Sequence, residues 1–200
     1  MLEIGNEIAM AFRIKSKLTF VHIAKCGGNT ITDWIRKDTH EYSGEPHELP
    51  STLPNEWQDK MFCVVRNPWS RVVSFFTYFK RTWSKHKKYE YLEVINKGFE
   101  NFVLRCDGWH PDIAPSIGLP WNEQLCSLYI HPNMEYLRLE NLKSDFEKIK
   151  KICDRQDDLE KKNQSNSLPY QSFYNDKTIK RVAEMFEQDI KQFNYSYEKI

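Results

Sequence analysis

The sequence predicts an α/β fold in which a central, mainly parallel β-sheet is flanked by helices. Short apolar, β-rich runs recur at Leu18–Ile23, Met61–Val65 and Met134–Leu139, and segments with apolar residues at helical spacing lie between them. Strands that alternate with helices are typical of parallel sheets, which bind ligands at the carboxyl ends of their strands. Because 200 residues with 14% aromatic side chains are enough for one apolar core, we expect residues 1–200 to form a single domain.

The first apolar run, Leu18–Ile23, is the pattern of a buried strand, and it breaks at a turn that contains two glycines. We expect a helix from Asn29 to about Lys37 after this turn, with Asn29 or Thr30 as its cap. Residues 38–57 are polar and rich in proline and glycine, which predicts an irregular connection.

The second strand, Met61–Val65, leads into a helix that begins near Pro68, because proline suits the first turn of a helix. The apolar face of this helix consists of Val72, Val73, Phe75, Phe76 and Phe79. Further helices are expected at residues 99–103, 121–129, 141–152 and 175–193, with a loop rich in proline and glycine at 108–120 and a polar surface loop at 154–172.

Charge and cysteine content narrow the possible functions. The chain carries 29 Lys and Arg against 28 Asp and Glu, so an anion-binding site has to be local rather than a general basic surface. Apolar runs are too short for a membrane span, and the first residues lack the basic and apolar regions of a signal peptide. Five cysteines without a C-x-x-C pair are typical of reduced thiols, so we expect a cytoplasmic protein without a zinc site.

The turn after the first strand has the residues of an anion-binding loop. Gly27 and Gly28 allow a tight turn and close approach of the backbone to a ligand, and the following helix start offers N–H groups to an anion. Lys25 adds a charge and Thr30 a hydroxyl. The loop of a nucleotide triphosphatase would carry its lysine after the second glycine, whereas Lys25 precedes both glycines. A plain strand–helix turn is the alternative interpretation.

A second candidate anion site follows the second strand. Arg66 stands where many phosphate-transfer enzymes have an acidic Mg²⁺ ligand, and a guanidinium there favours a phosphate over a metal ion. Ser74 adds a hydroxyl on the following helix. Two strand ends that each carry a cation and a hydroxyl indicate one ligand with two separated anionic groups. A carboxylate partner for Arg66 and simple helix packing for Ser74 are the alternatives.

Both loops resemble those of sulfotransferases that use 3′-phosphoadenosine 5′-phosphosulfate (PAPS). Phe20–Ile31 is similar to the 5′-phosphosulfate loop of that family, and Phe62–Ser74 is similar to its 3′-phosphate motif, including the spacing from Arg to Ser. The resemblance is to the carbohydrate-type enzymes, which include the heparan 2-O- and chondroitin sulfotransferases. Weaker similarity extends through Tyr136–Leu142 and Phe193–Tyr197.

This resemblance implies a single sulfotransferase domain with a P-loop-like three-layer fold, PAPS as donor, 3′-phosphoadenosine 5′-phosphate (PAP) as product, and no metal ion. Residues 163–167 match a family segment that folds over the cofactor. Ala24 and Cys26 replace the usual Pro and Thr, so that only the backbone donors of the loop are expected to remain at position 26. The residues implied for cofactor binding are Lys25, Cys26, Gly27, Gly28, Asn29 and Thr30 at the 5′-phosphosulfate, with Arg66 and Ser74 at the 3′-phosphate.

Sulfuryl transfer needs a base that takes the proton of the acceptor hydroxyl, and histidine suits this role near neutral pH. His47 lies on the connection between the two loops, where the related enzymes often carry their catalytic histidine. The alternatives are His40, Glu41, Glu45 and Glu48, or no role for the loop histidine at all. His22 is interpreted as a core residue. Lys25 is the second predicted catalytic residue, because its charge can stabilise the bridging oxygen as the sulfuryl group leaves.

The leading interpretation is a PAPS-dependent sulfotransferase that acts on a hydroxyl of a carbohydrate or related acceptor. Residues 80–88 are basic with interleaved aromatic side chains, which favours either a rim for an acidic or sugar acceptor or a solvated helix end. Two other interpretations are a P-loop nucleotide kinase and a non-enzymatic nucleotide- or nucleic-acid-binding module, whose affinity would fall steeply with salt. We expect no nucleic-acid partner; the identity of the acceptor and the oligomeric state stay open.

Overall fold

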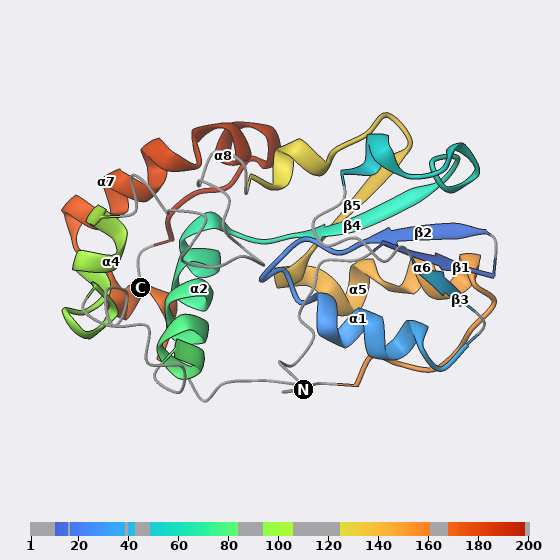
Figure 1. Cartoon of the computed structure of the whole chain (residues 1–200), viewed down its shortest axis with the longest axis horizontal. Helices are drawn as coiled ribbons and strands as arrows, with labels where there is room; N and C mark the ends of the chain where they lie inside the picture. The colour runs from blue at the N-terminus through green and yellow to red at the C-terminus, as the bar shows by residue number, and fades with distance from the viewer. Residues whose placement is uncertain are drawn as a thin grey trace. The chain divides into compact units, whose positions relative to one another are not determined.

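The computed structural model describes residues 11–15, 17–38, 40–42, 49–83, 94–105, 125–160 and 168–198 (Figure 1). The chain divides into two compact units. The first consists of Met1–Arg66 and Leu128–Gln164, and the second of Asn67–Ser127 and Ser165–Ile200.

The first unit is built on a five-stranded sheet with the order β3-β1-β2-β4-β5. Its strands are β1 (Ala11–Ile14), β2 (Leu18–Val21), β3 (His40–Tyr42), β4 (Met61–Val65) and β5 (Met134–Arg138). The pairs β2–β4 and β4–β5 are parallel, whereas β1–β2 and β1–β3 are antiparallel. The three predicted strands therefore form a parallel part, but the expectation of a mainly parallel sheet needs correction: the sheet is mixed, because β1 and β3 extend it with antiparallel pairings.

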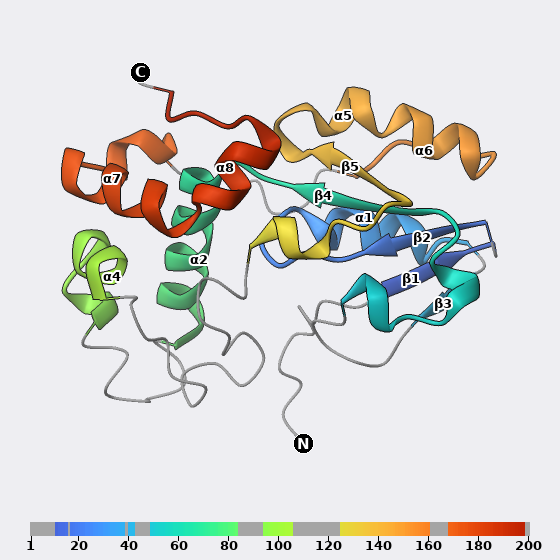
Figure 2. The ribbon, with the colours of Figure 1, turned by 90° about the horizontal axis from the view of Figure 1, so that it is seen from above.

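Helices α1 (Gly28–Ile35), α5 (Leu142–Asp145) and α6 (Glu147–Ile152) lie on one face of this sheet (Figure 2). Phe146, between α5 and α6, is buried; its ring centroid lies 4.9 Å from that of Trp34 on α1 and 6.3 Å from that of Phe62 on β4. The segment predicted as one helix over 141–152 is thus two short helices that separate at Phe146. Their shared contact with α1 and β4 fixes the helix layer on the sheet.

The second unit consists of helices around an aromatic core. Its described elements include α2 (Pro68–Trp83), α4 (Phe99–Arg105), η7 (Tyr170–Phe173), α7 (Asp176–Met185) and α8 (Glu187–Phe193). The ring of Phe76 on α2 lies 5.4 Å from Phe99 and 5.3 Å from Phe102, centroid to centroid, and 6.5 Å from Phe173. The aromatic positions that the sequence assigns to an apolar face of α2 therefore pack against α4 and η7.

The C-terminal helix begins where the sequence predicts it. Oδ1 of Asn175 accepts from the N–H of Thr178 at 3.0 Å, and Oγ1 of Thr178 accepts from the N–H of Asn175 at 3.0 Å, which makes a capping box at the start of α7. The helix then breaks at Phe186, so that α7 and α8 replace one predicted helix. Of the helix predicted at 121–129, residues 121–124 lie outside the described residues, and a 3₁₀ turn spans Cys126–Tyr129.

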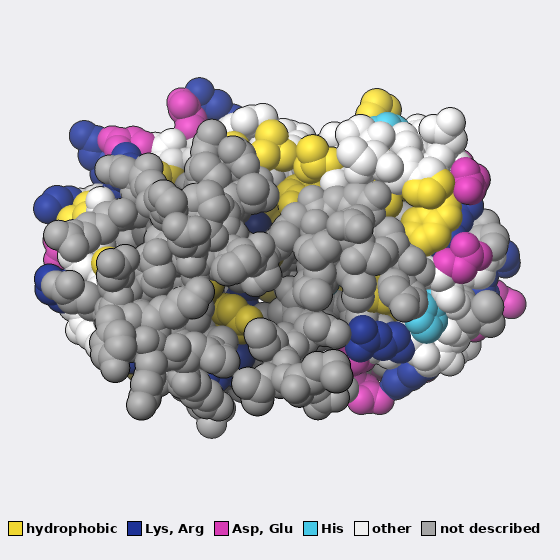
Figure 3. Space-filling model, in the orientation of Figure 1, with side chains coloured by type: hydrophobic (Ala, Val, Ile, Leu, Met, Phe, Trp, Pro, Cys, Tyr) yellow, Lys and Arg dark blue, Asp and Glu magenta, His cyan; other side chains and the backbone are white. Residues whose placement is uncertain are grey.

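Charged side chains of both signs are interspersed where the structure is coloured in Figure 3, as the net charge of +1 would suggest. Within the described ranges, no helix combines the length and the apolar character needed to cross a bilayer.

Candidate functional site

The turn between β2 and α1, predicted to bind an anion, leads directly into the helix. Lys25 and Gly27 have positive φ values of 62° and 80°, and α1 begins directly after Gly27. Gly27 is the N-cap of α1, and no side chain caps this helix start by a hydrogen bond. The cap predicted at Asn29 or Thr30 is therefore wrong, because the helix begins early enough to include both residues in its first turn. A helix start without a side-chain cap offers its N–H groups and the positive end of its dipole to an anion.

Both glycines of the loop are needed for close packing. A Cβ on Gly28 would lie 1.9 Å from Nε2 of His22, so the imidazole occupies the space that a side chain would need. A Cβ on Gly27 would lie 2.6 Å from Cδ1 of Leu139, and the positive φ of Gly27 favours glycine independently. The loop therefore rests on the end of β2 on one side and on the residue after β5 on the other.

Arg66 joins this loop to the end of β4 within the first unit. Its half-buried side chain donates a hydrogen bond from Nη1 to the carbonyl oxygen of Lys25 at 3.2 Å. The side chain of Arg66 thus contacts the backbone of Lys25, another predicted site residue, at the carboxyl edge of the parallel strands. This bond places the positive charge of Arg66 beside the turn.

Cys26 differs from the other loop residues. Its side chain is buried, and its N–H donates to the carbonyl oxygen of Ile23 at 3.3 Å within the turn. Burial raises the pKa of the thiol of Cys63 on β4, and the nearby Cys26 thiol contributes to that rise. The thiol of Cys26 therefore faces protein rather than ligand, and its N–H already serves the turn.

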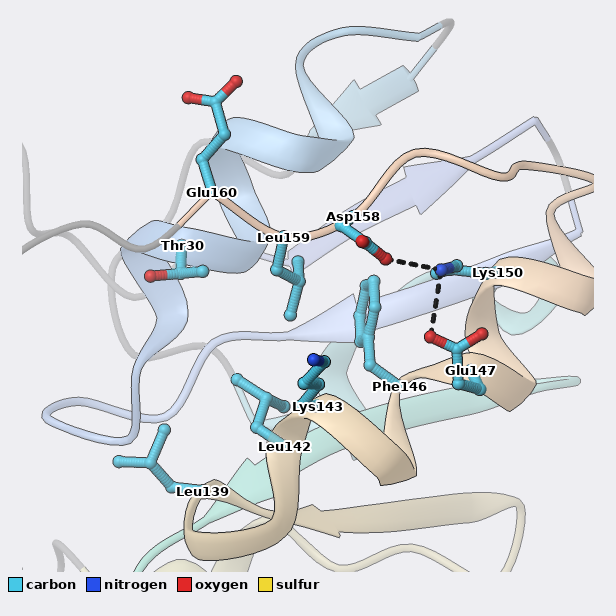
Figure 4. Close-up of a pocket in the computed structure, with 10 residues that line it drawn as sticks. All are labelled: Thr30, Leu139, Leu142, Lys143, Phe146, Glu147, Lys150, Asp158, Leu159 and Glu160. Atoms are coloured by element: carbon cyan, nitrogen blue, oxygen red, sulfur yellow. Dashed lines mark hydrogen bonds and ion pairs between the residues drawn. The ribbon is translucent and has the colours of Figure 1, made fainter.

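A cavity of about 420 Å³ adjoins the loop (Figure 4). Its apolar lining comes from Leu139, Leu142, Phe146 and Leu159, and Thr30 on the first turn of α1 borders it. Because Leu139 also contacts the position of Gly27, the cavity and the loop share a wall. The lining also includes five charged residues: Lys143, Glu147, Lys150, Asp158 and Glu160. A cavity of this volume that combines an apolar wall with polar groups is typical of a small-molecule site.

An extended segment, Arg155–Glu160, forms one side of this cavity, and we call it the strap. The guanidinium of Arg155 lies 3.6 Å from the ring centroid of Trp34 and donates to the carbonyl oxygen of Trp34 at 2.8 Å. Nε1 of Trp34 donates to the carbonyl oxygen of Asp157 at 3.0 Å. The strap is therefore fixed to α1 through one residue, Trp34, which contributes a ring contact with Arg155 and two hydrogen bonds.

Lys150 on α6 fixes the other end of the strap. Its Nζ lies 2.8 Å from Oδ1 of Asp158 and 2.9 Å from Oε1 of Glu147 (Figure 4). These hydrogen bonds, first to Asp158 and then to Glu147, raise the pKa of Lys150, and the bond from Lys150 lowers the pKa of Asp158. Both groups therefore stay charged near neutral pH, and the ion pair holds the strap beside the cavity.

The start of α2, in the second unit, is closed by a side chain. Oδ1 of Asn67 accepts from the N–H of Trp69 at 3.1 Å and from that of Ser70 at 3.4 Å, while Nδ2 of Asn67 donates to the carbonyl oxygen of Ser196 at 3.0 Å. Ser74 is half-buried in the second turn of α2. Since Arg66 ends one unit and Ser74 belongs to the other, their joint binding of a phosphate stays a prediction.

Several predicted features lie outside the described residues: His47 with Glu45 and Glu48, residues 163–167, and positions 84–88 of the basic stretch. Of that stretch, Lys80 and Arg81 are described and are exposed near the end of α2. The roles of His47 and of the stretch as an acceptor rim stay predictions.

His40, the nearest alternative base, lies on β3 and is paired with Ile14, which in turn is paired with Leu18 at the start of β2. The loop follows the other end of β2. The register therefore puts His40 at the amino end of β2, away from the loop, and this placement argues against His40 as the base. His22, interpreted from the sequence as a core residue, is 7% exposed.

The cavity and the strap are structural features of the candidate site that the sequence pattern did not reveal. Their residues come from three distant segments, around Thr30, Leu139–Lys150 and the strap, so no local motif joins them. One signal in the sequence could have indicated the strap. Lys150 lies among apolar residues on one side of its predicted helix, and a buried lysine needs an acidic partner such as Asp158.

Comparisons with known proteins give one extensive match. A model of the sulfotransferase family matches residues 10–196, a range that includes both structural units. No curated protein matches significantly. Among solved structures, the chain is similar to a sulfotransferase from Alicyclobacillus acidocaldarius with 12% identity and a TM-score of 0.34; the match covers 70% of this chain and 56% of that one. This chain thus spans little more than half the length of that solved structure.

Proposed function

The chain belongs to the sulfotransferase family, and we propose that it transfers a sulfuryl group from PAPS to a hydroxyl of a carbohydrate or related acceptor. The observation that carries this proposal is the strand–loop–helix unit of β2 and α1, whose helix start has no side-chain cap and lies beside Lys25 and Arg66. PAPS supplies the activated sulfuryl group, and PAP is the product that remains bound.

The loop suits the phosphosulfate end of the donor. Backbone N–H groups of Gly28, Asn29 and Thr30 belong to the first turn of α1 and can donate to phosphate oxygens, and the helix dipole favours the same negative charge. Lys25 lies in this turn, two residues before Gly27, and is proposed to supply a cation. As the sulfuryl group leaves, charge builds on the bridging oxygen, and a cation near that oxygen would stabilise the transition state more than the ground state.

Arg66 and Ser74 are proposed to bind the 3′-phosphate. The hydrogen bond from Nη1 to the carbonyl oxygen of Lys25 orients the guanidinium of Arg66 beside the turn between β2 and α1. Arg66 is held at the end of β4, and Ser74 follows eight residues later in the sequence. Arginine binds phosphate through paired hydrogen bonds, whereas serine adds one neutral donor.

The cavity beside the loop is proposed to take the adenosine part of the donor. Its lining of Leu139, Leu142 and Phe146 suits a flat aromatic base, and Thr30 borders both the cavity and the proposed phosphosulfate site. A ligand that spans loop and cavity would bring its anionic groups to the cations and its base to the apolar wall. The strap would then be the outer wall of the nucleoside site.

His47 is proposed as the general base. It lies five residues after the end of β3 in the sequence, outside the described residues, on the connection between the two loops. A general base would take the proton of an acceptor hydroxyl that attacks sulfur in line with the leaving phosphate. Residues 80–88 are proposed to border the acceptor, with basic groups for an acidic sugar and Trp83 for stacking on a pyranose face.

The proposal treats residues 1–200 as one sulfotransferase domain with a P-loop-like three-layer arrangement, and the family match from 10 to 196 supports it because the match includes both units. It also includes a cytoplasmic location, which is supported by the absence of a disulfide among the cysteines that the structure describes, Cys26, Cys63, Cys126 and Cys153.

Calorimetry with PAP, AMP and ATP tests the proposed function. We expect PAP to bind more tightly than AMP by about 1.5–3 kcal/mol, the usual scale of hydrogen bonds to a charged group, because only PAP has a 3′-phosphate. Equal affinities for PAP and AMP would contradict the proposal. Tighter binding of ATP with Mg²⁺ would favour the kinase interpretation, and a steep salt dependence with DNA or RNA would favour the nucleic-acid-binding module.

A further inference from the structure

We infer that His22 is a positioning residue for the phosphosulfate loop: its imidazole sets the spacing between the end of β2 and the first turn of α1, and it makes glycine necessary at position 28. This inference rests on the proposed function, because the groups that His22 positions are those proposed to bind the donor. It assigns a role to a residue that the sequence pattern alone places in the core.

His22 continues the row of β2 side chains that face the helix layer. Side chains alternate along a strand, so Leu18, Phe20 and His22 point to the same side. Phe20 is fully buried and lies 5.0 Å from Phe62, centroid to centroid. The ring of His22 stacks on that of Phe20 at 5.9 Å with an interplanar angle of 21°. The imidazole is therefore held in place by its stacking on Phe20 of the sheet.

The first turn of α1 rests directly on this ring. A Cβ on Gly28 would lie 1.9 Å from Nε2, 2.0 Å from Cδ2 and 2.6 Å from Cε1 of His22. Three ring atoms at such separations mean that a whole edge of the imidazole, not the tip of a flexible chain, fills the space. A side chain at position 28 would have to displace either the stacked ring or the helix start.

The contact between Gly27 and Leu139 is less rigid than that between Gly28 and His22. There a Cβ would meet only Cδ1 of Leu139 at a short distance, 2.6 Å, while the next atom lies at 3.8 Å. A leucine methyl can rotate away, whereas the ring of His22 cannot leave without losing its stack on Phe20. Of the two contacts, the one with His22 therefore fixes the height of the loop above the sheet.

The spacing matters because the proposed donor contacts come from the backbone of this turn. A displacement of about 1 Å at groups that orient a substrate can lower a rate by roughly 10²-fold. Removing the imidazole would let the helix start sink toward β2, and adding a Cβ at position 28 would lift it. The two changes act in opposite directions on one distance, so they should compensate each other.

A double-mutant cycle tests this role, with the variants His22→Ala, Gly28→Ala and their combination. We expect each single change to raise the Kd for PAP and the KM for PAPS by roughly 10- to 100-fold, while KM for the acceptor stays unchanged. In the combination, the methyl of alanine at 28 occupies part of the space of the lost ring. Its Kd for PAP should therefore fall below that of the worse single variant, which is strong non-additivity between contacting residues.

Gly98→Ala is the matched control. Gly98 in the second unit has a φ of 97°, and a Cβ there would meet nothing within 4 Å, so the change introduces backbone strain without a clash. We expect it to lower Tm and to leave the Kd for PAP unchanged. If Gly28→Ala lowers Tm as Gly98→Ala does but leaves the Kd for PAP as it was, position 28 has a structural role only and the inference is wrong.

The remaining outcomes are also decisive. If Gly28→Ala alone fails to fold and the double variant folds and binds PAP, the compensation is confirmed; His22→Asn, a smaller polar change, then gives the single-variant Kd. Additive effects in a protein whose wild type binds PAP overturn the role of His22 and leave the proposed function intact. A wild type that does not bind PAP overturns the proposed function, and this inference with it.

Discussion

The starts of α1 and α2 differ in how their first N–H groups are capped. At α1, Gly27 has no side chain to offer and no side-chain cap is present. At α2, the amide of Asn67 accepts from the N–H groups of Trp69 and Ser70. Because the first N–H groups of a helix need an acceptor, the start of α1 is suited to an external anion, while that of α2 is already served by its own chain.

This difference implies that the two anionic groups of the proposed donor, PAPS, are recognised in different ways. The 5′-phosphosulfate would be bound mainly by backbone N–H groups, with Lys25 beside them, whereas the 3′-phosphate would be bound by the side chains of Arg66 and Ser74. Side-chain recognition can be removed by substitution without moving the backbone. Backbone recognition changes only when the loop itself moves.

The largest expected effect is on the rate of sulfuryl transfer, and it comes from a residue outside both helix starts. It distinguishes the chemical step from binding of the anionic donor. His47→Ala should lower kcat by roughly 10²- to 10⁴-fold, the usual range for a general base, and leave the Kd for PAP nearly unchanged. Steady-state kinetics and calorimetry measure the two effects. His131→Ala is the control, because His131 precedes β5 at the amino edge of the parallel strands. If His47→Ala keeps its rate, the base is assigned wrongly, and Glu48→Ala is the next variant to measure.

At the α1 start, Lys25→Ala should lower kcat by roughly 10²- to 10³-fold, the cost of removing one group that stabilises transition-state charge. The Kd for PAP should change much less, since the backbone N–H groups remain. Single-turnover transfer from radiolabelled PAPS measures the chemical step. Lys60→Ala, which removes an exposed lysine before β4, is the matched control. A normal rate for Lys25→Ala would assign this lysine to the surface.

At the end of β4, Arg66→Ala should remove the preference for PAP over AMP, a loss of about 1.5–3 kcal/mol. The hydrogen bond to the carbonyl oxygen of Lys25 is lost as well, so AMP binding should weaken slightly. Arg36→Ala, at the exposed C-cap of α1, controls for the loss of one positive charge. Retention of the full preference for PAP by Arg66→Ala would move the 3′-phosphate site elsewhere.

Asn67→Ala tests the side-chain cap of α2. It should lower the free energy of unfolding by about 1 kcal/mol, the typical cost of an N-cap, with an additional loss from the bond to the carbonyl oxygen of Ser196. Denaturant unfolding measures this change, and the Kd for PAP should stay within twofold of wild type. A large loss of PAP affinity with unchanged stability would mean that the two helix starts are not as different as their capping indicates.

The smallest effect is expected from removal of divalent metal ions. In the proposed donor site, Lys25 and Arg66 supply the positive charge, and sulfuryl transfer moves less charge than phosphoryl transfer from ATP. Dialysis against EDTA should therefore leave kcat unchanged. Loss of activity that Mg²⁺ restores would return the kinase interpretation to first place.

The parallel strands and the loop were predictable because each is a local pattern. β4 is an uninterrupted buried apolar run, and the glycine pair lies in the short turn between β2 and α1. β1 was missed because its four residues include Arg13, which looks solvent-exposed in the sequence but is buried through bonds to Asp59 and Thr19. β3 carries polar residues at an edge and has no apolar alternation to reveal it.

The helix start and the cavity could not be predicted for different reasons. Asn29 and Thr30 are good capping residues, yet the helix begins earlier, because Gly27 has a positive φ and is the N-cap. The cavity depends on the meeting of α1, the residues after β5 and the strap, and such long-range contacts are not encoded in any one window of sequence.

The mixed sheet has a consequence for the order in which the protein folds. β1 and β2 are joined by a turn in which the N–H of Lys17 bonds to the carbonyl oxygen of Ile14, so this hairpin needs only local chain closure and can form early. β4 pairs with β2 only after a loop of some forty residues closes, and the bond from Arg66 to Lys25 needs the same closure. We therefore expect the hairpin to form early and the turn between β2 and α1 to gain its final shape late, when β4 docks beside a β2 that is already in place.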